Sequence, residues 1–128
     1  MWVSAIDASD RLHGDGEAVL EQLISGRLPM ALTTDLVLDE TLTILKRRGA
    51  RIPSIQHIAN NLLSSPLLRV IYVDEPLFRQ SLLDFGKYEQ LSFTDAVSLA
   101  LMTRHKIREI YSHDKDFDLK GIVRKERP

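Results

Sequence analysis

Residues 91–117, which read LSFTDAVSLALMTRHKIREIYSHDKDF, decide the fold because they contain a helix, a strand and an acidic turn in succession. Ser92 or Thr94 is a typical helix N-cap, and the apolar residues that follow predict a helix as far as about His105. Residues 109–112 then predict a short strand. This strand runs directly into a turn of polar and acidic residues. A helix that leads into such a strand is the repeating unit of an α/β fold.

The rest of the chain continues this alternation of helices and short apolar strands. Apolar spacing and end signals predict four further helices, at about residues 17–25, 35–48, 53–63 and 76–85, and three further strands, at residues 28–33, 70–73 and 122–123. In the last of these helices we expect Phe78, Leu82 and Phe85 to form the buried face. We therefore predict one α/β domain over residues 1–128, with three layers and a central, mainly parallel sheet covered by helices on both faces.

The composition is that of an ordinary globular protein, with 44% hydrophobic and 27% charged residues. The net charge of −1 excludes a generally basic nucleic-acid binder, so contact with nucleic acid would need a local basic patch, a metal ion or a partner chain. No apolar run approaches the ~20 residues needed to cross a bilayer. The chain has no cysteine, which excludes disulfides and thiolate metal sites. We expect a cytoplasmic protein that does not contact membranes.

Three acidic residues lie at positions other than the polar faces where acidic residues are usually found: Glu40, Asp95 and Asp114. Glu40 lies four residues before the apolar Ile44, which is expected to place it on the buried stripe of its helix. Asp95 lies in the first turn of a helix, and Asp114 follows the strand 109–112. Each has an ordinary alternative. These are a glutamate at the edge of the stripe that reaches solvent, an acid that complements the helix dipole, and a turn residue that bonds its own backbone.

The expected location of these acids favours a shared site. In open parallel sheets, ligands bind beyond the carboxyl ends of the strands. Asp114 lies at such an end, Asp95 begins a helix, and Glu40 lies in the second turn of the helix after the strand 28–33. Carboxylates that converge raise one another's pKa and destabilise the fold unless a divalent cation balances them. A ligand set made only of oxygen atoms suits Mg²⁺ or Mn²⁺ better than zinc.

Three short motifs resemble those of the PIN-domain family, particularly its VapC-like toxin ribonucleases. They are residues 33–42 (TTDLVLDETL), 91–100 (LSFTDAVSLA) and 112–117 (SHDKDF), which are similar to the second, third and fourth acidic motifs of the family. Their order and spacing also agree, and the similarity covers roughly residues 2 to 123. The resemblance implies a central parallel sheet and metal-dependent endonucleolytic cleavage of RNA.

The resemblance also implies roles for individual residues and partners. Glu40, Asp95 and Asp114 would bind the metal and act in catalysis, with Asp116 as a peripheral ligand. Ser112 would position the attacking water or the phosphate by hydrogen bonding. The family pattern further implies a homodimer and, in a toxin–antitoxin pair, a small antitoxin protein as partner.

One family motif has no counterpart in this sequence. The family's first motif is a strand that ends in aspartate, followed a few residues later by a tryptophan that Trp2 matches. Val3 to Asp7 then match the helix that follows it. The strand and its aspartate would therefore fall before Met1, and we expect the chain as given to have little nuclease activity.

Basic residues near Asp114 are candidates for contacts to RNA phosphates. Arg104 and Lys106 are the best placed of these, whereas the basic cluster at residues 46–51 closes a helix and is expected mainly to complement its dipole. Two other functions remain open. The first is a phosphohydrolase with an Asp-x-Asp motif at Asp114 and Asp116. The second is a PIN-like binding module that has lost catalysis and acts through its dimer or antitoxin surface.

Overall fold

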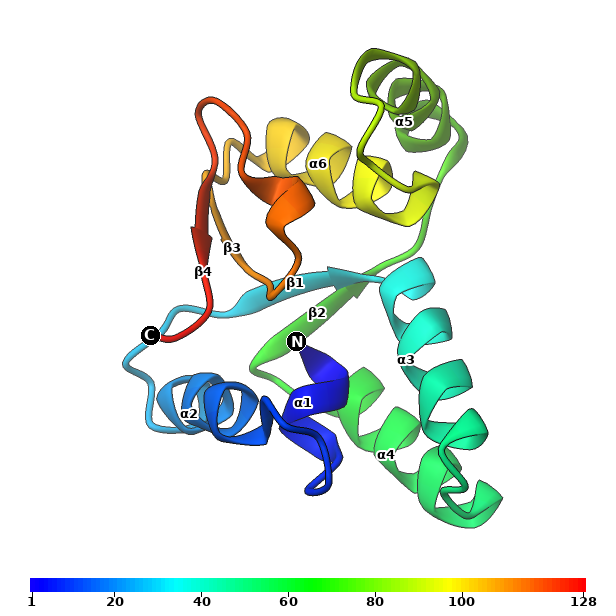
Figure 1. Ribbon diagram of the computed structural model, residues 1–128, viewed down its shortest axis with the longest axis vertical. Coiled ribbons are helices and arrows are strands. Elements are labelled where there is room, and N and C mark those ends of the chain that lie inside the picture. Colours follow the sequence, from blue (N-terminus) through cyan, green and yellow to red (C-terminus); the bar gives the residue numbers. More distant parts are fainter. The chain divides into compact units, whose positions relative to one another are not determined.

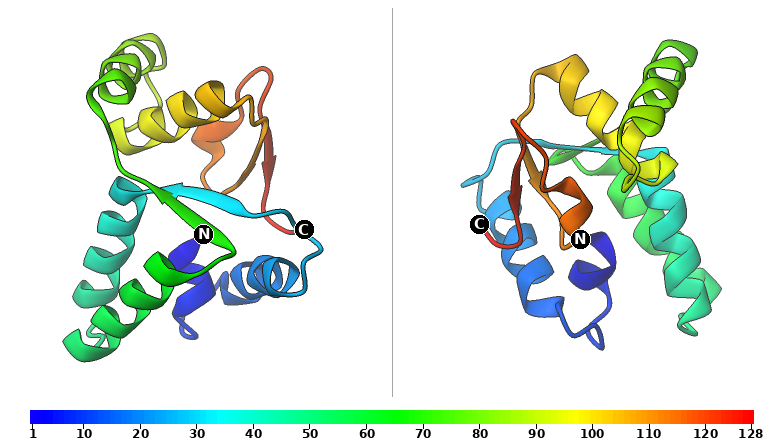
Figure 2. Two further views of the ribbon diagram at one scale, coloured as in Figure 1. Left: turned by 180° about the vertical axis from the view of Figure 1, so that it is seen from behind. Right: turned by 45° about the horizontal axis from the view of Figure 1, so that its top comes forward.

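The computed structural model describes residues 1–128, with the side chain of Val3 excepted. The chain divides into two compact units, which are described one at a time. The first unit contains Met1–Ile71 together with Arg127–Pro128, and the second contains Tyr72–Glu126. The course of the chain through both units can be followed in Figure 1 and, from two further directions, in Figure 2.

The first unit combines four helices with a pair of parallel strands. Its elements, in chain order, are α1 (Trp2–Ile6), α2 (His13–Ile24), β1 (Ala31–Thr34), α3 (Asp35–Arg47), α4 (Ile52–Ser64) and β2 (Leu68–Ile71). Ala31 of β1 pairs with Leu68 of β2, and Thr34 pairs with Ile71. Two parallel strands need a long crossover connection, and α3 with α4 supplies it.

The N-terminal helices of this unit are held together by a close backbone contact and by one arginine. A Cβ atom at Gly16 of α2 would overlap the backbone of Ala5, so only glycine allows this approach of α2 to α1. Arg48, at the end of α3, donates to Asp7 (2.9 Å) and to Asp10 (2.7 Å). Hydrogen bonds from Ser9 and then from Arg48 lower the pKa of Asp7 to about 2. Arg48 therefore lies at the end of α3 and also binds the connection between α1 and α2.

Helix α3 begins as predicted, but its buried side differs from the expected one. Thr34 caps the helix, because its Oγ1 accepts from the backbone N–H of Val37 (3.2 Å). The buried residues of α3 are Leu38, Thr41 and Leu45, whereas Glu40 is exposed. The prediction that Glu40 lies on the buried stripe was wrong. Leu38, Thr41 and Leu45 recur at spacings of three and four residues, and they turn the neighbouring Glu40 toward solvent.

The second unit contains two long helices and a second pair of parallel strands. Its elements are α5 (Glu75–Lys87), α6 (Phe93–His105), β3 (Glu109–Tyr111), the 3-10 turn η1 (Lys115–Phe117) and β4 (Val123–Lys125). Glu109 pairs with Val123 and Tyr111 pairs with Lys125. The segment between β3 and β4 carries η1, which lies beside the strand pair in both views of Figure 2.

Helix α6 is the most buried element of the second unit. Six of its residues are buried: Ala96, Val97, Leu99, Ala100, Leu101 and Met102. A helix that is apolar on almost every side must be covered on almost every side. The first turn of α6 is therefore attached to the most buried part of this unit, and Asp95 belongs to that turn.

Helix α5 buries a different face from the one that its apolar pattern suggested. Leu77 and Ser81 are buried, while Phe78, Leu82 and Phe85 are 46%, 50% and 47% exposed. The prediction of a buried Phe78, Leu82 and Phe85 face was wrong. The packing partner decides which face of a helix is covered, and Ser81 can be buried without an unpaired hydroxyl because its Oγ donates to the Leu77 carbonyl (2.7 Å).

The predicted class, α/β with parallel strand pairing, is confirmed. In the described chain the four strands form two separate two-stranded sheets, one in each unit, so β1 and β3 each have one hydrogen-bonded neighbour. No helix among the described residues is long and apolar enough to cross a membrane. The single domain over residues 1–128 stays a prediction.

Candidate metal centre

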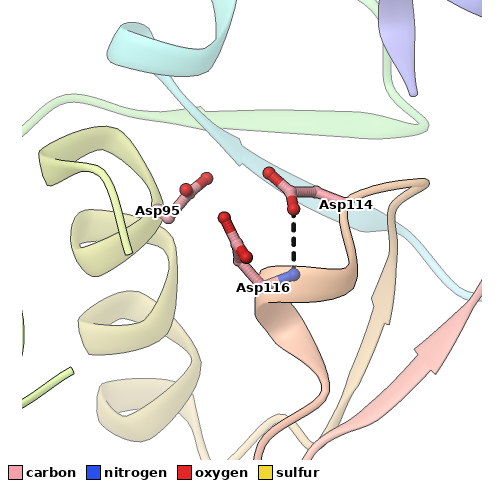
Figure 3. A group of neighbouring side chains, drawn as sticks. All are labelled: Asp95, Asp114 and Asp116. Atoms are coloured by element: carbon pink, nitrogen blue, oxygen red, sulfur yellow. Dashed lines mark hydrogen bonds between the residues drawn. The ribbon is translucent and has the colours of Figure 1, made fainter. Parts of the chain in front are cut away.

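Three aspartates of the second unit bring their carboxylates together at one point. One oxygen atom each from Asp95, Asp114 and Asp116 lies within 4.8 Å of the other two. Figure 3 shows the three side chains directed toward one another, Asp95 from the start of α6 and the other two from the segment between β3 and β4. Glu40 belongs to α3 of the first unit, so its membership of this group stays a prediction.

Asp95 is held by the cap of its own helix. The backbone N–H of Asp95 donates to Ser92 Oγ (3.2 Å), and the backbone N–H of Ser92 donates to Asp95 Oδ2 (3.1 Å). This reciprocal capping box confirms the predicted N-cap at Ser92. It also uses one carboxylate oxygen of Asp95, Oδ2, while the side chain as a whole is directed toward Asp114 and Asp116 (Figure 3).

Asp114 and Asp116 are held by a chain of hydrogen bonds in the short segment after β3. The backbone N–H of Asp114 donates to Ser112 Oγ (3.0 Å), and the backbone N–H of Asp116 donates to Asp114 Oδ1 (2.9 Å). Phe117 follows at once and is 4% exposed, so it anchors the segment in the core. The turn that the sequence predicted at Asp114 is present, and it brings Asp114 and Asp116 close together.

The electrostatics of the cluster show a local excess of negative charge. Burial raises the pKa of Asp116 above its ordinary value, and the nearby Asp114 and Asp95 carboxylates raise it further. Each of these causes disfavours the ionised form of Asp116. A divalent cation would reverse that balance, because carboxylate oxygens are the ligands that Mg²⁺ and Mn²⁺ prefer. The donor set therefore fits such an ion.

The other predicted site residues lie in the same unit but have different surroundings. Ser112 accepts from Asp114 and supports the cluster directly. Arg104 makes a bidentate ion pair with Asp74, at 2.9 and 3.1 Å, and Asp74 caps α5. Lys106 is exposed and ends α6 in a left-handed conformation, with φ of 55°. Contacts of Arg104 and Lys106 to a substrate stay predictions.

Sequence reasoning gave Asp116 only a peripheral place, whereas the structure puts it beside Asp95 and Asp114. The available signal was the spacing of two between Asp114 and Asp116 at the end of a strand. In one turn of 3-10 helix, this spacing lets the first carboxylate accept from the backbone of the second. Both side chains then remain on the same side of the turn (Figure 3).

Known proteins resemble this chain in sequence over most of its length. The PIN-domain family matches residues 2–122. The 23S rRNA-specific endonuclease VapC20 of Mycobacterium tuberculosis is 31% identical over 124 residues, which cover 95% of this chain and 90% of that protein. A VapC ribonuclease of Archaeoglobus fulgidus is 32% identical over 115 residues, covering 88% of this chain and 71% of that one.

The structural comparison agrees with the sequence comparison. The crystal structure of Mycobacterium tuberculosis VapC20, described as a sarcin–ricin loop cleaving toxin, superimposes with a TM-score of 0.79. It is 30% identical in sequence, and the match covers 95% of this chain and 91% of that one. The PIN-like fold expected from the three motifs is thereby confirmed. The chain belongs to the PIN-domain family, and the relatives it resembles are named as VapC ribonucleases.

Proposed function

We propose that this protein is a VapC-type endoribonuclease, the toxin of a toxin–antitoxin pair, and that it works with Mg²⁺ or Mn²⁺. The observation that carries the proposal is the convergence of Asp95, Asp114 and Asp116 to within 4.8 Å in a chain that matches nuclease relatives over nearly its whole length. We assign metal binding to these three residues and to Glu40. The catalytic set is Glu40, Asp95 and Asp114, with Asp116 as a further ligand.

The residues around the cluster have separable tasks in this proposal. Asp95, Asp114 and Asp116 provide the negative charge that holds the ion and fix where a phosphate can approach. The three aspartates would hold a divalent cation, which would supply a water molecule of lowered pKa and positive charge for the attacked phosphate. Ser112 accepts a hydrogen bond from Asp114 and keeps its own hydroxyl proton for a substrate oxygen. Arg104 and Lys106 supply positive charge for the RNA backbone.

The substrate class follows from the relatives. VapC20 is named for cleavage of 23S rRNA, and the second relative is named a ribonuclease. We therefore propose RNA as the substrate, with 23S rRNA as the first candidate, and the cytoplasm as the place of action.

A groove in the first unit supports an antitoxin as partner. Its volume is about 390 Å³, and it is lined by Trp2, Leu20, Leu23, Ile24, Ile58, Asn61, Leu62, Ser65, Leu67 and Leu68. This lining is almost entirely apolar, as expected for a groove that receives the apolar face of a helix. Trp2 is the one tryptophan of the chain, so its fluorescence reports on the groove. Emission that stays unchanged when an antitoxin binds would exclude this location.

Exposed apolar side chains on α5 support the predicted homodimer. Phe78, Leu82 and Phe85 lie on one helical face at 46 to 50% exposure. The rings of Phe78 and Phe85 also contact Phe93, at centroid distances of 4.9 and 6.0 Å, so the face is preformed. Contiguous exposed apolar surface of this kind marks contact sites between proteins.

The first prediction concerns the repulsion within the cluster. Because the pKa of Asp116 is raised in the folded protein, ionisation of Asp116 costs stability as the pH rises from about 3.8 through the raised pKa. Asp116→Asn should therefore raise the melting temperature of the metal-free protein at pH 7. The gain should disappear as the pH falls toward 3.8, because the carboxyl is then protonated in both the folded and the unfolded protein.

Saturating Mn²⁺ should reverse this order, stabilising the parent protein more than Asp116→Asn. Thermal melts with and without Mn²⁺ at several pH values measure both effects. An equal melting temperature for the two metal-free proteins at pH 7 would contradict the shared negative site.

The second prediction concerns RNA cleavage. Asp114→Asn and Glu40→Gln should each abolish the low Mn²⁺-dependent cleavage of ribosomal RNA expected of the parent protein, because a lost ligand misplaces the attacking water. Asp39→Asn is the matched control, since Asp39 is the exposed acid next to Glu40 on α3. It should leave the rate unchanged. If the parent protein binds Mn²⁺ and RNA but cleaves none, the binding-module alternative is favoured instead.

The third prediction concerns the dimer. Leu82→Glu should convert a dimer at micromolar concentration into a monomer, because it places a charge in the apolar face of α5. Leu63→Glu on α4 is the control, since Leu63 is 49% exposed and Leu82 is 50% exposed. It should remain a dimer. Light scattering measures the mass of each, and a monomeric parent protein would rule out the homodimer.

A further inference from the structure

One arginine binds both ends of the segment that carries Asp114 and Asp116. Arg124 lies in β4, and its side chain is only 13% exposed. Its Nη1 donates to the carbonyl oxygen of Ser112 (3.1 Å), and its Nε donates to Asp118 Oδ1 (2.7 Å). Ser112 and Asp118 are the two ends of the segment 112–118, which contains Asp114, Asp116 and the turn η1.

The remaining contact of Arg124 lies outside that segment. Nη1 also donates to Glu126 Oε1 (2.6 Å), two residues further along the chain. Glu126 thus fixes the guanidinium of Arg124, and the same guanidinium binds Ser112 and Asp118. Hydrogen bonds between charged groups are shorter and stronger than neutral ones. The side chain of Arg124 in the neighbouring strand β4 therefore joins the two ends of the segment 112–118.

We infer that Arg124 is the positioning residue of this site, fixing the segment 112–118 so that Asp114 and Asp116 face Asp95. The inference rests on the proposed metal site for its functional meaning, but its structural part does not need the metal. Arg124 acts through Ser112 and Asp118, and neither of these contacts involves the carboxylates of the cluster.

The geometry requires arginine at this position. The guanidinium offers several N–H donors in a rigid plane, so two of them can reach a backbone carbonyl and a carboxylate at the same time. A lysine keeps the charge but has a flexible point donor, which cannot hold both partners in fixed relative positions. Residues that hydrogen-bond directly to metal ligands typically affect metal affinity by about 10- to 100-fold. Arg124 acts one contact further from the ligands, so we expect an effect at the lower end of that range.

An ion pair between β3 and β4 provides the matched control. Lys125 of β4 binds Glu109 of β3 (2.9 Å), and neither belongs to the segment 112–118. The backbone N–H of Ser112 also donates to the carbonyl of Lys125 (3.0 Å), which continues the strand pairing. If Arg124 only joined the strands, loss of the Glu109 pair should have the same consequences as loss of the Arg124 contacts.

The experiment compares Arg124→Lys with Glu109→Gln in the whole protein, using two readouts. Amide hydrogen exchange of Asp114 and Asp116, measured by NMR without metal, reports on the segment itself. A calorimetric titration with Mn²⁺ reports on the site. In Arg124→Lys we expect about tenfold faster exchange at both amides and about tenfold weaker Mn²⁺ binding. Glu109→Gln should change neither by more than about twofold. Asp118→Ala, which keeps Arg124 but removes its carboxylate acceptor, should reproduce the Arg124→Lys result.

The outcomes separate this inference from the proposed function. Unchanged exchange and affinity in Arg124→Lys would overturn the positioning role, as would equal effects in Glu109→Gln. A parent protein that binds no Mn²⁺ would overturn the metal site, and the exchange rates would then still decide whether Arg124 fixes the segment.

Discussion

The second unit has to hold three carboxylates close together, and its backbone must resist their mutual repulsion. Asp95, Asp114 and Asp116 place oxygen atoms within 4.8 Å of one another. Burial raises the pKa of Asp116, and the neighbouring Asp114 and Asp95 carboxylates raise it further. Like charges at this separation stay together only if the backbone that carries them cannot relax. The packing of α6 and the hydrogen bonds of the segment after β3 meet that requirement from two sides.

Asp95 is held in place by helix packing, whereas Asp114 and Asp116 are held mainly by hydrogen bonds. On one side, Asp95 belongs to a helix whose residues from Leu99 to Met102 are all buried, so the first turn of α6 has little freedom to move away. On the other side, a short turn without a core of its own is held by hydrogen bonds and by the anchor Phe117. Arg124 closes that turn from β4. A divalent cation would then convert the repulsion into attraction, so metal binding and local stability are coupled.

Local chemistry could be predicted from the sequence wherever a residue acts on its own neighbours. Thr34, Ser92 and Asp74 cap the helices that follow them because a side-chain oxygen accepts from a backbone N–H three residues on.

Which face of a helix is buried could not be predicted in this way. The apolar residues Phe78, Leu82 and Phe85 form a regular stripe, yet α5 buries Leu77 and Ser81, because the packing partner decides which face is covered. For the same reason, the exposure of Glu40 could not be predicted from the spacing of apolar residues in α3. Asp95 and Asp114 were predicted as metal ligands from their places at a helix start and a strand end. That Asp116 lies as close to them as they lie to each other follows only from the geometry of η1.

The central claim is that one divalent cation binds between these three aspartates. The most direct measurement is paramagnetic broadening of backbone amide signals by Mn²⁺ added well below one equivalent. Signals of Asp95, Asp114 and Asp116 should broaden first and together, and broadening at Glu40 would add that residue to the site. Asp114→Asn should abolish the effect at all of these positions. Broadening spread evenly over exposed acids such as Glu75 and Glu89, with no preference for the cluster, would contradict the claim.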